Sequence, residues 1–137
     1  MKLVMDASCG AGFLMPDEQD PASLAALNAI EAGAETWIPT HWAVELSNML
    51  RNAEPKRINE AQSARLCAYA LSLESQVHVD SETYRRAFSE TLALAKTHGL
   101  TVYDAAYLEL AMRKGATLAT KDAALAKAAK SAGVPLL

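Results

Sequence analysis

The sequence predicts an α/β protein with a short parallel sheet flanked by helices on both faces. Short apolar runs that have the length of strands alternate along the chain with longer segments of helical spacing. This alternation is typical of parallel sheets whose strands are connected by helices. The runs are also apolar almost throughout, as expected for strands buried on both faces. The 137 residues suffice for one domain with its own core, so we expect a single domain over residues 1–137.

The predicted strands and helices follow one another without a linker or repeat. Four strands are expected at residues 2–5, 36–38, 77–79 and 116–119, with a short fifth strand at 134–136. The expected helices cover residues 23–32, 40–52, 55–75, 80–98, 101–115 and 121–132, with a short helix or tight turn at 7–15 and an exposed loop at 16–21. Thr40 and Thr101 stand where N-caps are expected. The break at residues 54–57 predicts a projecting helical hairpin.

Composition limits the function classes. The formal net charge of −3 argues against passive electrostatic binding of nucleic acid, unless several of the acids bind cations. Cys9 and Cys67 lack metal-site spacing and are expected to be buried free thiols. No apolar run approaches the roughly 20 residues that span a bilayer. Because Asp6 comes too early for a signal-peptide core, the sequence predicts a cytoplasmic protein without a membrane partner.

Asp104 stands out because it falls on the apolar side of its predicted helix. At about 100° per residue, Tyr107, Leu108 and Ala111 lie on that same side. An unpaired carboxylate in a core costs on the order of several kcal/mol, so something should compensate it. One compensation is local: Thr101-x-x-Asp104 has the spacing of a capping box.

Three further carboxylates occupy unusual places. Asp6 ends the first predicted strand, and Asp122 directly follows the fourth. Glu45 lies a turn inside its helix, at the edge of the apolar stripe. Each has an ordinary structural alternative: a helix cap for Asp6, a first-turn acid that complements the helix dipole for Asp122, and a boundary residue with its head in water for Glu45.

Taken together, the four acids predict a metal site. Two follow strands at one edge of the sheet, where open parallel sheets bind ligands, and two lie on helices that enter from that edge. Like charges raise one another's pKa, so such a cluster needs cations, and oxygen ligands favour Mg²⁺ or Mn²⁺. Metals held in this way can orient a phosphodiester and activate water. We therefore predict that Asp6, Glu45, Asp104 and Asp122 are catalytic and metal-binding residues.

Four short segments carry a family resemblance, in this order: Asp6-Ala7-Ser8, Glu45-Leu46, Leu100-Thr101-Val102-Tyr103-Asp104-Ala105-Ala106-Tyr107 and Leu118-Ala119-Thr120-Lys121-Asp122. With them, essentially the whole chain resembles the PIN-domain ribonucleases, specifically the VapC-type toxins of type II toxin–antitoxin pairs. The resemblance makes Asp6 and Asp104 the direct Mg²⁺ ligands, with Glu45 and Asp122 completing the acidic site.

The same resemblance implies roles beyond the four acids. Ser8 and Thr120 would lie just behind the ligands, where hydroxyl groups orient them or a water. The implied activity is endonucleolytic cleavage of RNA that leaves a 5′-phosphate and a 3′-hydroxyl. The implied partners are an RNA substrate, a cognate antitoxin and a second copy of the chain. The glycine-rich segment 8–12 departs from the family pattern, and we expect it to loosen the first helix.

Two other functions stay open on the sequence. The chain could be a PIN nuclease of RNA processing without a toxin role. It could also be a receiver-type signalling module, which would use Asp80 as phosphoacceptor but would lack a lysine after the last strand. His41 could serve as a general base, although a first-turn residue exposed near the cap is the simpler interpretation.

Overall fold

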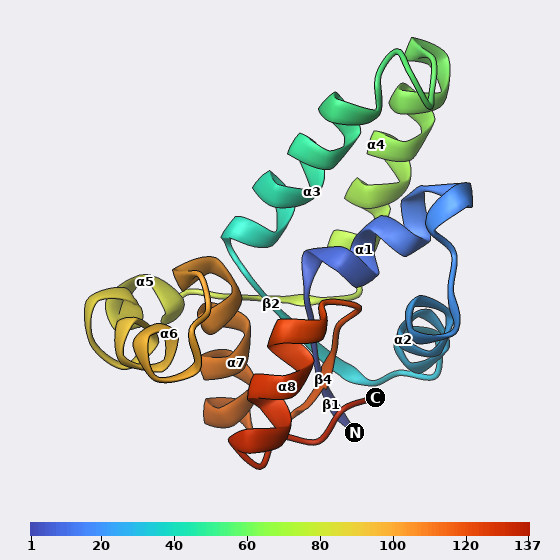
Figure 1. Cartoon of the computed structure of the whole chain (residues 1–137). Coiled ribbons are helices and arrows are strands. Elements are labelled where there is room, and N and C mark those ends of the chain that lie inside the picture. Colours follow the sequence, from blue (N-terminus) through green and yellow to red (C-terminus); the bar gives the residue numbers. More distant parts are fainter.

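Four parallel strands form one sheet in the computed structural model, which describes residues 1–137 with all their side chains except that of Pro16 (Figure 1). They are β1 (Lys2–Met5), β2 (Glu35–Pro39), β3 (His78–Asp80) and β4 (Thr117–Ala119), in the order β3-β2-β1-β4. Val4 pairs with Trp37 on one side and with Leu118 on the other. Three of the four β1 residues are fully buried, as expected for a central parallel strand. The predicted α/β class is confirmed.

Helices cover both faces of this sheet. They are α1 (Ala7–Leu14), α2 (Pro21–Glu31), α3 (His41–Ala53), α4 (Glu60–Glu74), α5 (Thr83–Arg86), α6 (Leu92–His98), α7 (Val102–Lys114) and α8 (Ala123–Ser131), with a 3₁₀ turn η1 (Pro16–Glu18) and a π-helical turn η2 (Ala87–Thr91). α7 packs across β1, β2 and β4, while α1 and α2 lie on the other side (Figure 1). α3 and α4 project from the sheet as the predicted hairpin. None of the described helices is long and apolar enough to cross a membrane.

Several predicted boundaries differ from the structure. α4 begins at Glu60, not at residue 55, because Asn59 and Gln62 form a reciprocal capping box there. The helix expected at 80–98 is divided by the π-helical turn η2. The expected fifth strand is a single bridge between Leu118 and Leu136. Thr40 holds the N-cap position of α3 but its side chain makes no capping hydrogen bond.

The glycine-rich start of α1 is closely packed, and the expectation that it loosens the helix is wrong. A Cβ atom on Gly10 would lie 2.8 Å from the Trp42 ring, and one on Gly12 would lie 1.9 Å from Ser23 Oγ. These glycines let α1 approach α3 and α2 closely. Cys9, directly before Gly10, is buried as predicted, whereas the prediction of a buried thiol is wrong for Cys67 on α4, which is exposed.

An ion-pair cluster joins β3 to α7. Arg113 donates to both carboxylate oxygens of Asp80, at 3.0 and 2.9 Å, and to both of Glu109, at 2.8 and 3.1 Å. Glu109 is only 4 % exposed, and Arg113 neutralises its charge. Asp80 also accepts from the Thr83 amide and hydroxyl. This buried and fully bonded carboxylate is not an accessible phosphoacceptor, which removes the signalling alternative.

Candidate active site at the carboxyl edge of the sheet

Asp6 forms the floor of the candidate site, immediately after the central strand β1. Its side chain caps α1 by accepting from the Cys9 amide at 3.0 Å, so the capping interpretation is correct for this residue. The Trp42 indole donates to the Asp6 carbonyl at 3.2 Å and fixes the strand end from the α3 side. Asp6 is 3 % exposed.

Two hydroxyl groups connect Asp6 to the segment after β4. Ser8 Oγ donates to Asp6 Oδ1 at 2.6 Å and accepts from the Lys121 amide at 2.9 Å. Thr120 Oγ1 donates to Asp6 Oδ2 and accepts from the Asp122 amide. Each hydroxyl therefore aims its only proton at Asp6. Both hydroxyls therefore contact Asp6, and their role behind a metal ligand stays a prediction.

Asp122 and Asp104 lie at the starts of two helices that face this edge. Asp122 caps α8 through Oδ1, which accepts from the Leu125 amide at 2.7 Å. Asp104 is in the first turn of α7, and Thr101 caps its amide at 3.2 Å, as predicted. Among the described residues the reciprocal bond of a capping box, from the Thr101 amide to the Asp104 carboxylate, is not formed. The Thr101 hydroxyl still offsets part of the cost, because its hydrogen bond lowers the pKa of Asp104, but burial outweighs it.

Glu45 is held from one side by two donors. The buried Tyr107 hydroxyl donates to Glu45 Oε1 at 2.9 Å. His41 Nε2 lies 3.2 Å from the same oxygen and 3.2 Å from the Tyr103 carbonyl. Both of these neighbours are acceptors, so Nε2 carries the proton. Glu45 thus has one oxygen fixed by Tyr107 and His41.

The four carboxylates share one electrostatic environment. Burial raises the pKa of Asp6, and the nearby Asp104 charge raises it further. The hydrogen bonds from Ser8, Thr120 and Cys9 act in the opposite direction and lower this pKa. Burial also raises the pKa of Glu45, with further contributions from Asp104 and Asp6. The pKa of Asp104 is raised first by burial and then by Asp122. These couplings link all four acids at the carboxyl edge of the sheet.

No basic side chain neutralises this cluster within the described part of the chain. Lys121, next to Asp122 in sequence, turns away and pairs with Asp20 at 2.9 Å. Burial lowers the pKa of His41, so its contact with Glu45 is a hydrogen bond of a neutral ring more than an ion pair. Four acids without a counterion match the donor chemistry that a divalent cation requires.

The described residues do not form a closed set of metal ligands. No group of three or more His, Cys, Asp or Glu side chains among them is arranged to hold a metal ion directly. This arrangement is compatible with Mg²⁺, which usually keeps several waters and takes one or two protein carboxylates. It does not provide the complete cage that Zn²⁺ or Ca²⁺ sites show.

Sequence reasoning missed the residues that hold Glu45. Tyr107 was assigned to the apolar side of α7 and is indeed 1 % exposed, but periodicity says nothing about where its hydroxyl points. His41 was expected to be exposed near the helix start and is half-buried instead. Its ring packs against Tyr107, with ring centroids 5.0 Å apart. The one signal available was its i, i+4 spacing to Glu45.

Comparison with known proteins identifies the family of this chain. Residues 3–131 match the model of the PIN domain family. The chain is 34 % identical over 128 residues to Ribonuclease VapC3 of Pyrobaculum aerophilum, covering 93 % of this chain and 94 % of that protein. The match spans all the elements that carry the four acids.

Solved structures with the same fold include three proteins of low sequence identity. PAE2754 of Pyrobaculum aerophilum superposes with a TM-score of 0.67 at 24 % identity, over 93 % of this chain and 84 % of that one. FitAcB of Neisseria gonorrhoeae superposes with a TM-score of 0.62 at 18 % identity, over 98 % of this chain and 96 % of that one. VapC20 of Mycobacterium tuberculosis, a Sarcin-Ricin loop cleaving toxin, superposes with a TM-score of 0.63 at 17 % identity, over 93 % of this chain and 95 % of that one. The chain belongs to the PIN domain family, and within it to the VapC ribonucleases.

Proposed function

We propose that this protein is a Mg²⁺-dependent endoribonuclease and the toxin of a toxin–antitoxin pair, with residues 1–137 as one nuclease domain. The observation that carries the proposal is the cluster of four carboxylates, coupled to one another and without a basic counterion among the described residues. Asp6 and Asp104 would hold the metal, Mn²⁺ being a substitute, and Glu45 and Asp122 would complete the acidic site.

The chain's own residues would perform most of the positioning. Ser8 and Thr120 hold both Asp6 oxygens in place, and Tyr107 with His41 holds one oxygen of Glu45. A bound Mg²⁺ would supply a Lewis acid for the phosphodiester and lower the pKa of a water. Glu45 Oε2 and Asp122 Oδ2 accept no hydrogen bond from the described residues, so they would accept a proton and orient that water for in-line attack. Cleavage would leave a 5′-phosphate and a 3′-hydroxyl.

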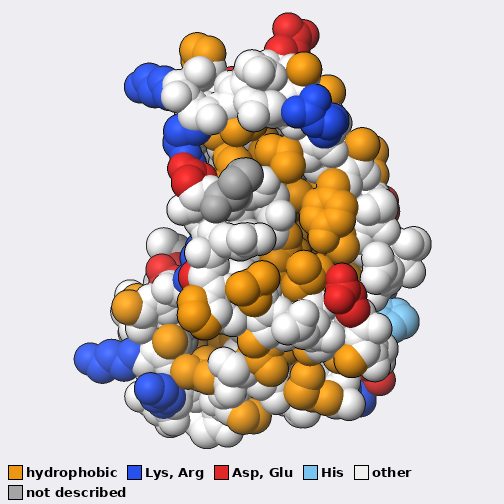
Figure 2. Space-filling model, turned by 90° about the vertical axis from the view of Figure 1, so that its right-hand side faces the viewer, with side chains coloured by type: hydrophobic (Ala, Val, Ile, Leu, Met, Phe, Trp, Pro, Cys, Tyr) orange, Lys and Arg blue, Asp and Glu red, His pale blue; other side chains and the backbone are white. Residues whose placement is uncertain are grey.

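The partners follow from the family and from the surface. The curated relative is a ribonuclease, and VapC20 is described as a toxin that cleaves the Sarcin-Ricin loop, which supports an RNA substrate here. Figure 2 shows hydrophobic side chains gathered down the side of the molecule formed by α1, α2 and α4. Half-buried Leu66 and partly exposed Tyr69 on α4 offer an apolar surface to an antitoxin segment. A second copy of the chain is the remaining partner.

An RNA-cleavage assay tests the catalytic proposal. The purified chain should cut RNA with Mg²⁺ or Mn²⁺ and stop with EDTA. Asp104→Asn should lower the rate by at least about 100-fold without changing the circular dichroism spectrum, because it removes one charge and keeps the shape. Glu31→Gln, an exposed acid on α2, serves as the matched control. Near-normal cutting by Asp104→Asn would refute the acidic-site mechanism.

Expression in cells separates the toxin from a processing nuclease. A toxin should arrest growth when it is produced alone, and co-expression of a small neighbouring antitoxin gene should relieve the arrest. Asp104→Asn should not arrest growth. Normal growth on production of an active nuclease would favour the RNA-processing alternative.

A further inference from the structure

We propose that the exposed ring of Tyr103 is a stacking surface for an RNA base next to the phosphate that is cut. This inference rests on the proposed RNA cleavage and adds a substrate contact to it. Tyr103 directly precedes Asp104 in the first turn of α7 and is 65 % exposed. None of the other three acids has an exposed aromatic residue as its neighbour in the chain.

The backbone on which this ring stands is fixed at both of its polar atoms. The Tyr103 carbonyl accepts a hydrogen bond from His41 Nε2 at 3.2 Å, and the Asp104 amide donates to Thr101 Oγ1 at 3.2 Å. That carbonyl and that amide belong to the same planar peptide group. The Tyr103 side chain therefore projects from a defined point at the start of α7.

Three rings lead from the core to this surface. Tyr107 is 1 % exposed, and the half-buried His41 ring packs against it with ring centroids 5.0 Å apart. The Tyr103 ring comes next, with its centroid 6.1 Å from that of His41 and an angle of 58° between the two planes. Tilted pairs at such distances are favourable aromatic contacts. His41 thus supports the Tyr103 ring, while most of Tyr103 stays open to solvent.

The ring stands beside two of the four acids. Asp104 is its neighbour in the chain, and His41, which contacts the ring, lies 3.2 Å from Glu45 Oε1 through Nε2. Each RNA phosphate joins two nucleotides, so a phosphate held among the acids has a base on either side of it. Proteins bind unpaired RNA bases by stacking them on aromatic side chains. Tyr103 is placed to receive one of these two bases.

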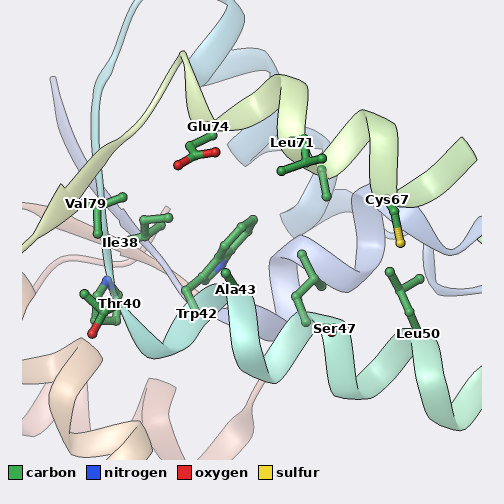
Figure 3. Close-up of a pocket in the computed structure, with 13 residues that line it drawn as sticks. Ile38, Thr40, Trp42, Ala43, Ser47, Leu50, Cys67, Leu71, Glu74 and Val79 are labelled. Atoms are coloured by element: carbon green, nitrogen blue, oxygen red, sulfur yellow. The ribbon is translucent and has the colours of Figure 1, made fainter. Parts of the chain in front are cut away.

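The apolar groove between α3 and α4 is a separate surface. Trp42 and Leu46 line it from the α3 side, and Figure 3 shows the Trp42 ring in the space between the two helices. His41 and Glu45 of the same helix instead contact α7. α3 therefore presents one side to α4 and another to the acids, and the groove takes no part in the base contact.

Cleavage kinetics test the stacking contact. Tyr103→Ala should raise KM for single-stranded RNA at least about 5-fold, the effect of losing one stacked base, with kcat nearly unchanged. Tyr103→Phe keeps the ring and should behave as the wild type. Tyr84→Ala removes an exposed tyrosine from α5, beyond the outer strand β3, and is the matched control. An unchanged KM in Tyr103→Ala, or an equal loss in Tyr103→Phe, would overturn the proposal.

Removal of the base gives an independent readout. RNA oligonucleotides would carry an abasic site directly on the 5′ or the 3′ side of the mapped cut. The wild type should show a raised KM at one of these two positions, and Tyr103→Ala should lose nothing further there, because the two changes remove the same contact. Losses that simply add at both positions would exclude Tyr103 as the stacking partner.

Metal binding distinguishes a substrate contact from support of the acids. Mn²⁺ affinity, measured by isothermal titration, should be equal in wild type and Tyr103→Ala, since the ring binds no metal. A weaker Mn²⁺ affinity in Tyr103→Ala would assign the residue to the positioning of Asp104 and would contradict the stacking role.

RNA binding without cleavage separates this inference from the nuclease proposal. Fluorescence anisotropy of labelled single-stranded RNA, with Ca²⁺ in place of Mg²⁺, should show at least about 5-fold weaker binding by Tyr103→Ala than by wild type or Tyr84→Ala. Such a loss in a protein that never cuts RNA would refute the nuclease and keep the base contact. Equal RNA binding by Tyr103→Ala in an active nuclease would do the reverse.

Discussion

At the scale of single residues, the site depends on side chains that fix the orientation of carboxylates. Tyr107 is the clearest case, because its hydroxyl is buried and donates to Glu45 Oε1. Burial and the adjacent Glu45 charge raise the pKa of Tyr107, so the hydroxyl stays protonated and remains a donor at physiological pH. If the Tyr107 hydroxyl lost its proton, Glu45 would lose one of the two donors that hold it.

Removal of that hydroxyl should reduce activity without unfolding the protein. Tyr107→Phe keeps the ring and its packing, so we expect little change in melting temperature and a loss of roughly 10- to 100-fold in RNA cleavage. The same variant should bind Mn²⁺ more weakly in a calorimetric titration. Tyr103→Phe, which changes an exposed ring whose backbone carbonyl contacts His41, is the matched control. Wild-type rates in Tyr107→Phe would show that this hydrogen bond has no role in catalysis.

Residue types and spacing predicted where the acids stand but not what holds Glu45. Asp104 was identifiable because a carboxylate on an apolar helix side needs compensation, and Asp6 because it ends a strand. The contact between Tyr107 and Glu45 joins residues 62 positions apart. Helical periodicity cannot reveal such a contact, because it reports burial and not the partner of a polar group.

At the scale of elements, the position of α1 depends on two glycines. Gly12→Ala places a Cβ atom 1.9 Å from Ser23 Oγ and 2.4 Å from Ser23 Cβ, so α1 and α2 must move apart. We expect a loss of about 1–3 kcal/mol in the free energy of unfolding, measured by urea denaturation. Because α1 follows Asp6 directly, activity should fall as well. Unchanged stability would show that the two helices adjust at no cost.

The ion-pair cluster between β3 and α7 makes the free energy of unfolding depend on pH in the acid range. Arg113 and Thr83 lower the pKa of Asp80 from 3.8 to about 2 against the effect of burial. A carboxylate whose pKa is lowered on folding stabilises the protein at pH values above its pKa in the unfolded state. This contribution disappears as the pH falls from 3.8 to about 2. Asp80 thereby contributes about 2 kcal/mol to the free energy of unfolding at neutral pH.

The variant Asp80→Asn tests the role of this ion-pair cluster. At pH 7 the variant should be less stable than the wild type, since Arg113 loses a buried partner, and its stability should decline less between pH 4 and pH 2. Asp17→Asn, which alters an exposed ion pair with Arg57, should change neither. Parallel pH profiles for wild type and Asp80→Asn would assign the acid sensitivity to other groups.

Local chemistry predicted most elements, and long-range packing explains the exceptions. The strand segments and the Thr101 cap follow from neighbouring residues. α8 begins at Ala123, two residues later than expected, because Asp122 is its N-cap and not a first-turn acid. The π-helical turn η2 has no such local signal, since residues 87–91 read as ordinary helix. Similarly, Arg113 binds Glu109 within α7 and Asp80 of β3 at the same time, and the helix pattern alone does not contain that contact between two elements.

At the scale of the whole molecule, the strand order creates the site. β1 lies between β2 and β4, so the chain leaves Asp6 toward one side and returns with Thr120 and Asp122 on the other. Such switch points are where open α/β sheets bind ligands. The α/β class and the carboxyl edge were predictable from alternating elements. The order β3-β2-β1-β4 was not, because it rests on pairing between distant segments.

Binding of Mn²⁺ to the free protein tests the central claim most directly. Isothermal titration of wild type, Asp104→Asn and the control Glu31→Gln, without RNA, separates metal binding from catalysis. The four-carboxylate site predicts saturable binding by wild type and control, and at least about 10-fold weaker binding by Asp104→Asn. Equal Mn²⁺ affinity in wild type and Asp104→Asn, with both proteins folded, would contradict it.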